Sequence, residues 1–592
     1  MSDKKRRIIF TLANLIIINW AVIAYLNLKY PFVGHDYGWG IPSILDSALH
    51  FRLNGLSIQW FTSSFGGGIP AFPNPNNEQF SLAVLLAIFF PPWQAVILSV
   101  ILYISVGFVA CEYFFRHTLK LNWTSSMLGA VFFSANGFMM ERVAAGHMGY
   151  FTLPLLALFL IALFDSSLPV IVGASIFGLL IALLLHYAGY FILVIFGFSI
   201  LIIIPVFYIL DPAMIDWKKL AARISLGGAI GLLISLSKLS AVYSFMRFFP
   251  RMISDHYETP LLLGVFGLIL QLLGTMSLAP LFLFVGINPD TLPNYILAAT
   301  RADFGFWEVD MSVTPIVFII LLVGLDVFFH HPKKYLTRLL GGKKKFAFLF
   351  LLLFLWLTLE FTLAQGLLYP VLRYLPILSS LHVNLRFAAA FIFPFAFIAT
   401  LIYDKWIRIQ LVSKQLVIFL VVNILAILPM GSYFIYSQDL IFRLYDIRDG
   451  QKVFERMQSG SSFEMLTVGQ SKDNTDALLT GVTNLNLYEP VFGYGLEYFH
   501  PQLHEGSVWD TSNGTYNLTD PTGYVYPENN NNQPFSRFRV EDKQALELFV
   551  NHIQPKWKIP AYQIVMNWVS GLSFLIAAIY LLYYLFYQPF SV

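Results

Sequence analysis

The stretch HPKKYLTRLLGGKKK, residues 331–345, decides how this chain is arranged, because it carries six basic side chains and no acidic one. It lies between two apolar runs, each near the roughly 20 residues that cross a bilayer as a helix. Lys and Arg gather in loops on the cytoplasmic side of a membrane, and acidic residues contribute little to that bias. The stretch therefore predicts a membrane protein whose residues 331–345 face the cytoplasm.

Long apolar runs recur on both sides of this loop and predict about a dozen transmembrane helices. Composition agrees, since 57% of the residues are hydrophobic and only 12% are charged, which is about half the charged share of a soluble domain. The predicted spans are 8–28, 92–114, 123–140, 149–165, 169–186, 188–209, 223–245, 311–330, 346–364, 387–403, 414–433 and 562–586.

Counting crossings from the basic loop places both termini in the cytoplasm. The basic run Lys4–Arg7 before the first span agrees, and no small-residue cleavage site follows, so we expect an uncleaved anchor. The apolar run 261–284 is also long enough to span, but one more crossing would turn residues 331–345 outward. We therefore expect this run to form a re-entrant or interfacial helix pair, helped by Gly264, Gly267, Gly274 and Pro280.

This topology leaves short connectors in the cytoplasm and four larger segments outside, at 29–91, 246–310, 365–386 and 436–558. The membrane module is predicted to cover 1–435. Residues 436–558 are polar and long enough for a small core, which predicts an extracytoplasmic α+β domain, and 559–592 would supply the last span and a cytoplasmic tail. Any chemistry is therefore expected on the outer face of an inner or plasma membrane.

Charge and cysteine content exclude several classes. The net charge of +3 is too small to indicate a nucleic-acid partner. The single cysteine, Cys111, excludes an internal disulfide and a cysteine-based metal site.

The first outer segment holds the most informative residues, VGHDYGWGIPSILDSALHFRLNGLSIQWFTSSFGGGIPAFPNPNNEQF at 33–80. It predicts a helix over 41–53 and a glycine turn at 66–68. Asp36 follows the first span among aromatic and glycine residues, where a carboxylate suits a general base for a substrate delivered from the lipid. Partial desolvation is expected to raise its pKa. A solvated interfacial aspartate or a helix N-cap is the alternative interpretation.

A long first outer loop with an early acid resembles the GT-C-type glycosyltransferases, and the closer resemblance is to the bacterial YfhO-like membrane proteins. Segments 133–154 (FSANGFMMERVAAGHMGYFTLP) and 373–387 (RYLPILSSLHVNLRF) resemble two later parts of that family. In the first loop the resemblance is carried by Arg52, Gly55, Trp60, Gly67 or Gly68, Pro70, Asn74, Asn76 and Asn77. It covers roughly 1–435 and implies a GT-C-like, all-α membrane fold that uses a polyprenyl-phosphate-linked sugar as donor. His35 stands where the family often has glycine, which leaves open whether it shares the role of Asp36.

Polar side chains at the predicted outer helix ends are candidates for binding the sugar, the acceptor or the lipid phosphate. Arg386 is the first choice for the phosphate, because a guanidinium presents a fixed fork of donors and stays charged. The full set of binding candidates is His35, Arg142, His147, His186, Arg247, Arg251 and Arg386. Anchoring at the headgroups is the alternative for each arginine.

Glu308 and Asp310 form an E-x-D pair that is a weak candidate for a divalent metal site, with a solvated helix start as the alternative. The first loop contains no D-x-D motif, so no metal or other cofactor is expected to be required.

These features predict an integral-membrane glycosyltransferase with inverting displacement, in which Asp36 takes the proton of an acceptor hydroxyl. Its partners would be membrane lipids, a polyprenyl-phosphate-linked sugar, and an outer acceptor that is a glycan, a teichoic acid, a lipid or a protein. The alternatives are a transporter or flippase of a lipid-linked substrate, a polysaccharide polymerase, and a scaffold without enzymatic activity.

Overall fold

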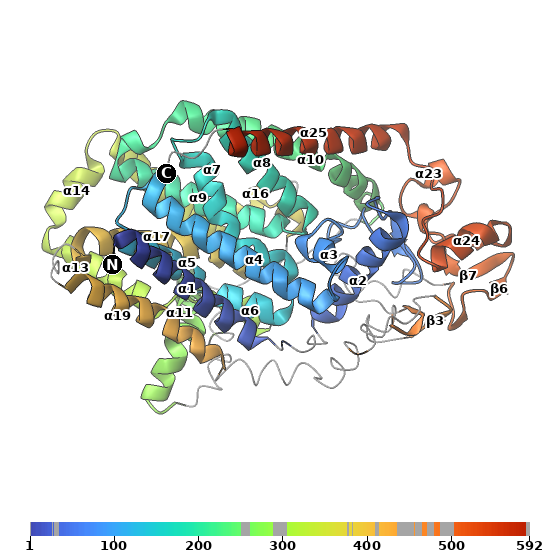
Figure 1. The fold of residues 1–592 in the computed structure, drawn as a ribbon, viewed down its shortest axis with the longest axis horizontal. Helices are drawn as coiled ribbons and strands as arrows, with labels where there is room; N and C mark the ends of the chain where they lie inside the picture. The colour runs from blue at the N-terminus through green and yellow to red at the C-terminus, as the bar shows by residue number, and fades with distance from the viewer. Residues whose placement is uncertain are drawn as a thin grey trace.

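The chain forms a bundle of long apolar helices with small sheets gathered at one end (Figure 1). This computed structural model describes residues 2–26, 28, 35–249, 261–287, 296, 305–375, 378–381, 383–408, 414–434, 455, 465–470, 479–485 and 502–587. The fold class expected from the sequence, a helical polytopic membrane protein with a small mixed α/β part near the C-terminus, is confirmed.

Within the described ranges, nine helices are long and apolar enough to cross a bilayer, and three shorter apolar helices accompany them. The long spans contain α1 (Asp3–Tyr25), α4 (Pro92–Tyr113), α9 (Tyr190–Leu210), α10 (Trp217–Met246), α11 (Leu261–Phe284), α15 (Lys344–Leu363), α17 (Ile392–Ile402), α19 (Gln415–Ile427) and α25 (Ala561–Tyr587). The shorter ones contain α7 (Leu156–Phe164), α8 (Val170–His186) and α13 (Pro315–His330).

The predicted span 123–140 is wrong as one continuous helix. The chain forms α5 (Trp123–Ser134), breaks, and starts again as α6 (Gly137–Ala145). Asn136 makes the break, because its side chain accepts a hydrogen bond of 2.8 Å from the Met139 backbone N–H and so caps the new helix. A hydropathy pattern does not register this cap, since the apolar residues continue through it.

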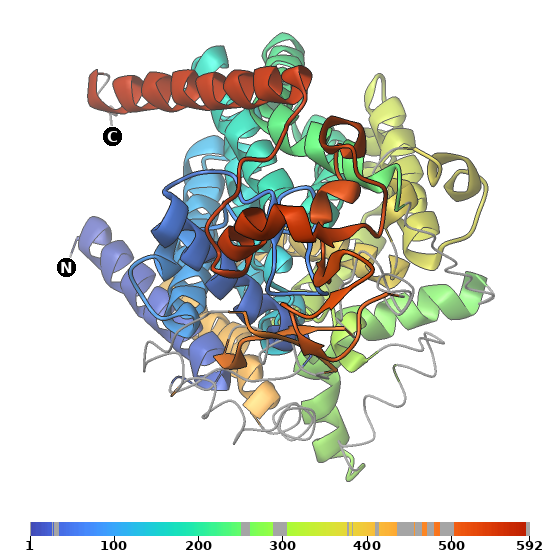
Figure 2. The same ribbon diagram turned by 90° about the vertical axis from the view of Figure 1, so that its right-hand side faces the viewer.

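The run 261–284 is helical but is broken at Gly274, whose φ of 40° lies outside the helical range. α11 as a whole is long enough to cross a bilayer, but each of its two halves is far shorter than the roughly 20 residues that a span needs, and Figure 2 shows the halves running in different directions. The residues just before the break are hydrogen-bonded to the segment that leads into α13. The backbone N–H groups of Met311 and Val313 donate to the Gln271 and Leu272 carbonyls.

The first outer segment folds against the bundle as α2 (Tyr37–Asn54), the strands β1 (Phe61–Thr62) and β2 (Ile69–Pro70), and α3 (Leu82–Ala87). The predicted helix 41–53 is therefore present and begins four residues earlier. The two strands pair antiparallel around the turn Gly66–Gly68, in which all three glycines have positive φ. A Cβ on Gly68 would lie 2.8 Å from the Thr519 carbonyl oxygen, so this turn also contacts the C-terminal segment.

The C-terminal segment contains two three-stranded sheets and α24 (Lys543–Val550). One sheet has the order β4 (Val482–Asn484), β3 (Thr467–Gly469), β5 (Gly506–Ser507), and the other β6 (Thr511–Ser512), β7 (Thr515–Thr519), β8 (Arg537–Arg539). Its buried side chains share one core with the first outer segment, with members Trp60, Phe65, Phe72, Val468, Leu518 and Phe549 among others. The two segments are therefore one packed unit.

The basic loop and the sheets lie at opposite ends of the bundle (Figure 1). The helix α14 (Pro332–Leu340), formed from that loop, lies at the same end as the start of α1 and the last turns of α25. At the other end, α2 and α3 lie beside the C-terminal sheets.

Candidate functional site

The end of α6 is packed onto the start of α2. Gly146 ends α6 with a φ of 77°, and a Cβ there would lie 2.7 Å from the Tyr37 ring. The Tyr37 hydroxyl donates a hydrogen bond of 2.6 Å to the Val143 carbonyl. Because the chain turns at this point, the next residue, His147, is brought beside Asp36.

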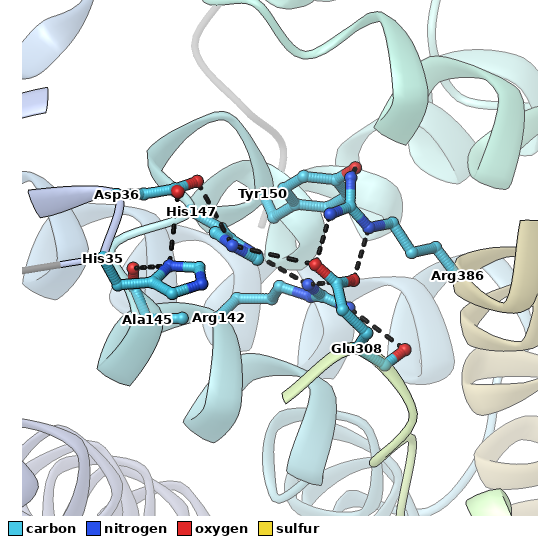
Figure 3. A network of polar contacts seen from close by, with 8 residues as sticks. All are labelled: His35, Asp36, Arg142, Ala145, His147, Tyr150, Glu308 and Arg386. Atoms are coloured by element: carbon cyan, nitrogen blue, oxygen red, sulfur yellow. Dashed lines mark hydrogen bonds and ion pairs between the residues drawn. The ribbon is translucent and has the colours of Figure 1, made fainter. Parts of the chain in front are cut away.

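Both carboxylate oxygens of Asp36 contact imidazoles (Figure 3). His35 Nδ1 lies 3.2 Å from Oδ1, and His147 Nε2 lies 3.2 Å from Oδ2. His35 has a φ of 43°, an uncommon value for a residue with a side chain, and its Nδ1 is also 3.2 Å from the Ala145 carbonyl oxygen. The Asp36 side chain remains 24% exposed, so a substrate can reach it.

The protonation state of His147 follows from its partners. Arg142 Nη1 lies 2.6 Å from Nδ1, and a guanidinium can only donate, so Nδ1 accepts and Nε2 carries the proton that faces Asp36. Burial lowers the pKa of His147 to about 3, with Arg142 and Arg386 adding to the effect of burial. His147 is therefore neutral near pH 7, and its Nε2–H donates a hydrogen bond to the Asp36 carboxylate.

The expected rise in the pKa of Asp36 is wrong. Burial would raise this pKa, but His147, His35 and Arg386 together hold it below its ordinary value. Burial would lower the pKa of His35, but the neighbouring Asp36 raises this pKa above its ordinary value. Asp36 is thus ionised and able to accept a proton.

Glu308 lies between two arginines from different parts of the chain (Figure 3). Arg142 Nη1 is 2.7 Å from Oε2, Arg386 Nε is 2.5 Å from the same oxygen, and Arg386 Nη2 pairs with Oε1. Burial would raise the pKa of Glu308, but the two guanidinium groups hold it well below its usual range. Arg386 Nη1 donates a hydrogen bond of 2.7 Å to the Tyr150 hydroxyl.

Glu308 and Asp310, the weak candidates for a metal site, contact different protein groups. Asp310 lies in a separate network, where it accepts hydrogen bonds of 2.9 Å from the Tyr433 hydroxyl and 3.0 Å from the Ser312 backbone. It also caps the second half of α11 through the Thr275 N–H. Both carboxylates are therefore committed to protein partners.

A different group has the composition of a metal site. One ligand atom each from His35, Asp36 and His147 lie within 4.8 Å of one another, and two imidazoles with a carboxylate suit several divalent metals. However, both Asp36 oxygens already contact imidazoles, and Arg142 occupies the free lone pair of His147. An ion could bind only if these contacts were exchanged.

The other predicted binding residues lie apart from this cluster. His186 packs against the rings of Phe72 and Phe80. Arg247 is exposed at the end of α10, where its guanidinium carbon lies 4.6 Å from the Phe248 ring centre. Arg251 lies outside the described residues.

The sequence reading missed Tyr150. Its ring lies 5.1 Å from the guanidinium carbon of Arg142 and 5.2 Å from that of Arg386, and its hydroxyl accepts from Arg386. A tyrosine near a helix end is also typical of the aromatic belt at a membrane interface, so its sequence position did not distinguish it.

No protein-family model and no curated protein matches this chain. Solved structures do resemble it in fold. The oligosaccharyltransferase of Archaeoglobus fulgidus, in complex with zinc and sulfate, has a TM-score of 0.40 and 15% identity, over 80% of this chain and 62% of that chain. Its apo form has a TM-score of 0.40 and 14% identity over 80% and 64%. ArnT from Cupriavidus metallidurans, bound to undecaprenyl phosphate, has 0.38 and 15% over 81% and 85%.

This chain therefore spans less than two thirds of the archaeal enzyme. At these identities and TM-scores the likeness concerns the general arrangement of helices and relates no residue of one protein to a residue of another.

Proposed function

We propose that this protein transfers a glycosyl group at the extracytoplasmic face of an inner or plasma membrane, with Asp36 as the general base. The observation that carries the proposal is that Asp36 is ionised and partly exposed, with both oxygens held by imidazoles. A base must be fixed, accessible and unprotonated before it can take a proton. Asp36 meets these three conditions.

The donor would be a sugar carried on a polyprenyl phosphate. Nucleotide sugars stay in the cytoplasm, so a transferase with an outer site needs a donor presented from the bilayer. Arg386 supports this choice, because 14% of its side chain is exposed whereas Arg142 is fully buried. Nη1 of Arg386 is bonded to a neutral hydroxyl, which a phosphate oxygen would replace favourably.

In the reaction, the acceptor hydroxyl would lose its proton to Asp36 as its oxygen attacks the anomeric carbon. The bond from that carbon to the phosphate oxygen breaks, and the phosphate leaves as an anion paired with Arg386. No acid is needed for this leaving group. A single displacement inverts the anomeric centre, and the acceptor is a glycan, a teichoic acid, a lipid or a protein.

Reconstitution tests the proposal against a flippase, which remains the second candidate. The protein is placed in liposomes with undecaprenyl-phosphate-linked glucose, mannose or N-acetylglucosamine, labelled in the sugar, together with an envelope glycan fraction. We expect label to move from the lipid to the glycan fraction. Movement of unaltered lipid between leaflets, without label transfer, would support the flippase and contradict the transferase.

We further propose that this transfer needs no divalent metal. Glu308 is held by arginines, each Asp36 oxygen contacts an imidazole, and Nδ1 of His147 accepts a hydrogen bond from Arg142. Transfer is therefore expected to change less than about twofold after treatment with EDTA, within the scatter expected when no functional group is lost. Loss of activity that added Mn²⁺ restores would contradict this and assign the three residues as metal ligands.

A further inference from the structure

The helix α14 and the residues after it concentrate positive charge that the proposed reaction does not use. Residues 331–345 contain six basic side chains and no acidic one, although the whole chain has a net charge of only +3. Three of these basic residues, Lys333, Lys343 and Lys345, are exposed. Figure 1 shows α14 at the opposite end of the bundle from α2, which begins beside Asp36. This charge is therefore not part of the candidate site.

The acidic side chains on the elements beside α14 have partners of their own. The helix α13 and the turn 403–407 each carry one acid. On α13, Asp326 Oδ1 lies 3.3 Å from His330 Nδ1. In the turn 403–407, Asp404 Oδ1 lies 3.1 Å from Arg408 Nε. The positive charge of residues 331–345 is thus available to a partner outside the protein.

Exposed apolar side chains on both sides of α14 indicate that it lies at a bilayer surface. Phe329, near the end of α13, is 69% exposed, and Phe346, near the start of α15, is 55% exposed. Both belong to apolar helices, where such side chains face lipid. The rings of Tyr335 in α14 and Trp406 lie 6.4 Å apart, and both residue types are enriched at the headgroup level.

The helix α14 is amphipathic. Tyr335 and Leu339, four residues apart, lie on one side of the helix and are half-buried. Lys333 and Thr337 have the same spacing, lie on the other side and are exposed. Leu340 at the end of the helix is apolar and 51% exposed. A short basic helix with one apolar side is suited to lie in the plane of the headgroups.

We infer that α14 and the lysines after it bind the headgroups of anionic phospholipids such as phosphatidylglycerol. Clusters of four to eight basic residues directly beside a membrane span attract anionic lipid, and this segment carries six. Lysine stems can lie along the acyl boundary while their ammonium groups reach the phosphates. Free phosphate would leave the exposed Leu340 and Phe346 without an apolar partner, whereas a lipid covers them. This inference does not depend on the proposed function.

Quenching of a fluorescent label beside α14 tests the inference in the full-length protein. The single cysteine of the chain, Cys111, is buried, so Leu340→Cys provides one accessible site for an NBD label. The labelled protein is reconstituted in phosphatidylcholine vesicles that contain a nitroxide-labelled phosphatidylglycerol or a nitroxide-labelled phosphatidylcholine. Phosphatidylglycerol is expected to quench about threefold or more strongly, because each lysine near the surface attracts it. Equal quenching by the two lipids would overturn the inference.

Two triple variants of the labelled protein separate local charge from net charge. The first carries Lys333→Gln, Lys343→Gln and Lys345→Gln. The second removes the same charge from exposed lysines of the C-terminal segment, through Lys543→Gln, Lys556→Gln and Lys558→Gln. We expect the first variant to bring the ratio of quenching by the two lipids to about one, and the second to leave it unchanged. An unchanged ratio in the first variant, or an equal fall in both, would contradict the inference.

Two further measurements identify the chemistry of the partner. Arginine at positions 333, 343 and 345 keeps the charge and should keep the preference for phosphatidylglycerol. Raising the NaCl concentration to about 1 M shortens the screening length to about 3 Å and should reduce the preference. Sodium phosphate at equal ionic strength should reduce it no further. Loss of the preference with arginine, or stronger competition by phosphate than by chloride, would refute lipid binding in favour of a lysine-specific or inorganic-phosphate site.

Discussion

Asp36→Asn is expected to reduce glycosyl transfer by the reconstituted protein about a thousandfold, in the range that removal of a general base produces. The asparagine side chain has the same size and can still accept the hydrogen bond from His147 Nε2, but it cannot take a proton from an acceptor hydroxyl. The measurement is the rate of label transfer from an undecaprenyl-phosphate-linked sugar to an envelope glycan, together with thermal unfolding in detergent.

Asp326→Asn is the matched control for this variant. Asp326 is 69% exposed on α13 and pairs with His330, which is equally exposed, so its substitution should leave transfer and unfolding unchanged. Normal product formation by Asp36→Asn would refute Asp36 as the base. Loss of folding in Asp36→Asn would instead make its role structural.

Glu308→Gln is expected to destabilise the protein by about 3–5 kcal/mol and to abolish transfer with it, because it leaves the buried Arg142 and the partly buried Arg386 without their counter-charge. Glu308 is 6% exposed and contacts both Arg142 and Arg386. Glutamine keeps the shape of the side chain, so the loss would report charge and not volume. Thermal unfolding in detergent at neutral pH measures the effect.

The exposed Glu541→Gln is the control and should unfold as the wild type does. Arg386→Gln, which removes one of the two arginines, gives a further check on the size of the effect. It should destabilise the Glu308→Gln variant less than it destabilises the wild-type protein. Additive losses from the two substitutions would show that Glu308 and Arg386 are not energetically coupled.

Helix lengths were predictable because crossing a bilayer requires a long apolar run, and most predicted spans have a counterpart among the described helices. The break at Asn136 was not predictable from hydropathy, because one capping side chain ends α5 and starts α6 inside an otherwise apolar stretch. The kink at Gly274 was foreseen only in part. Glycine made a break plausible there, but the bonds from Met311 and Val313 that complete it come from another segment.

The candidate site shows the same division. Sequence analysis selected Asp36, His147 and Arg386 one by one, each from its place near a predicted helix end. It made Glu308 a weak candidate for a metal ligand, with a solvated helix start as the alternative, because an E-x-D pair can bind a divalent metal when its other partners are unknown. In the folded chain Glu308 contacts Arg142 and Arg386, which make it a buried counter-ion.

Sequence alone determined that this is a helical membrane protein with a basic loop at 331–345 and an acid just after the first span, since length, apolarity and charge are local properties. Tertiary structure alone decided which charges meet. The pKa of Asp36 is lowered and that of Glu78 is raised because burial acts on both, and only Asp36 has enough hydrogen-bond donors and positive charge beside it to outweigh burial. Those neighbours come from distant segments, and no local pattern encodes their distance.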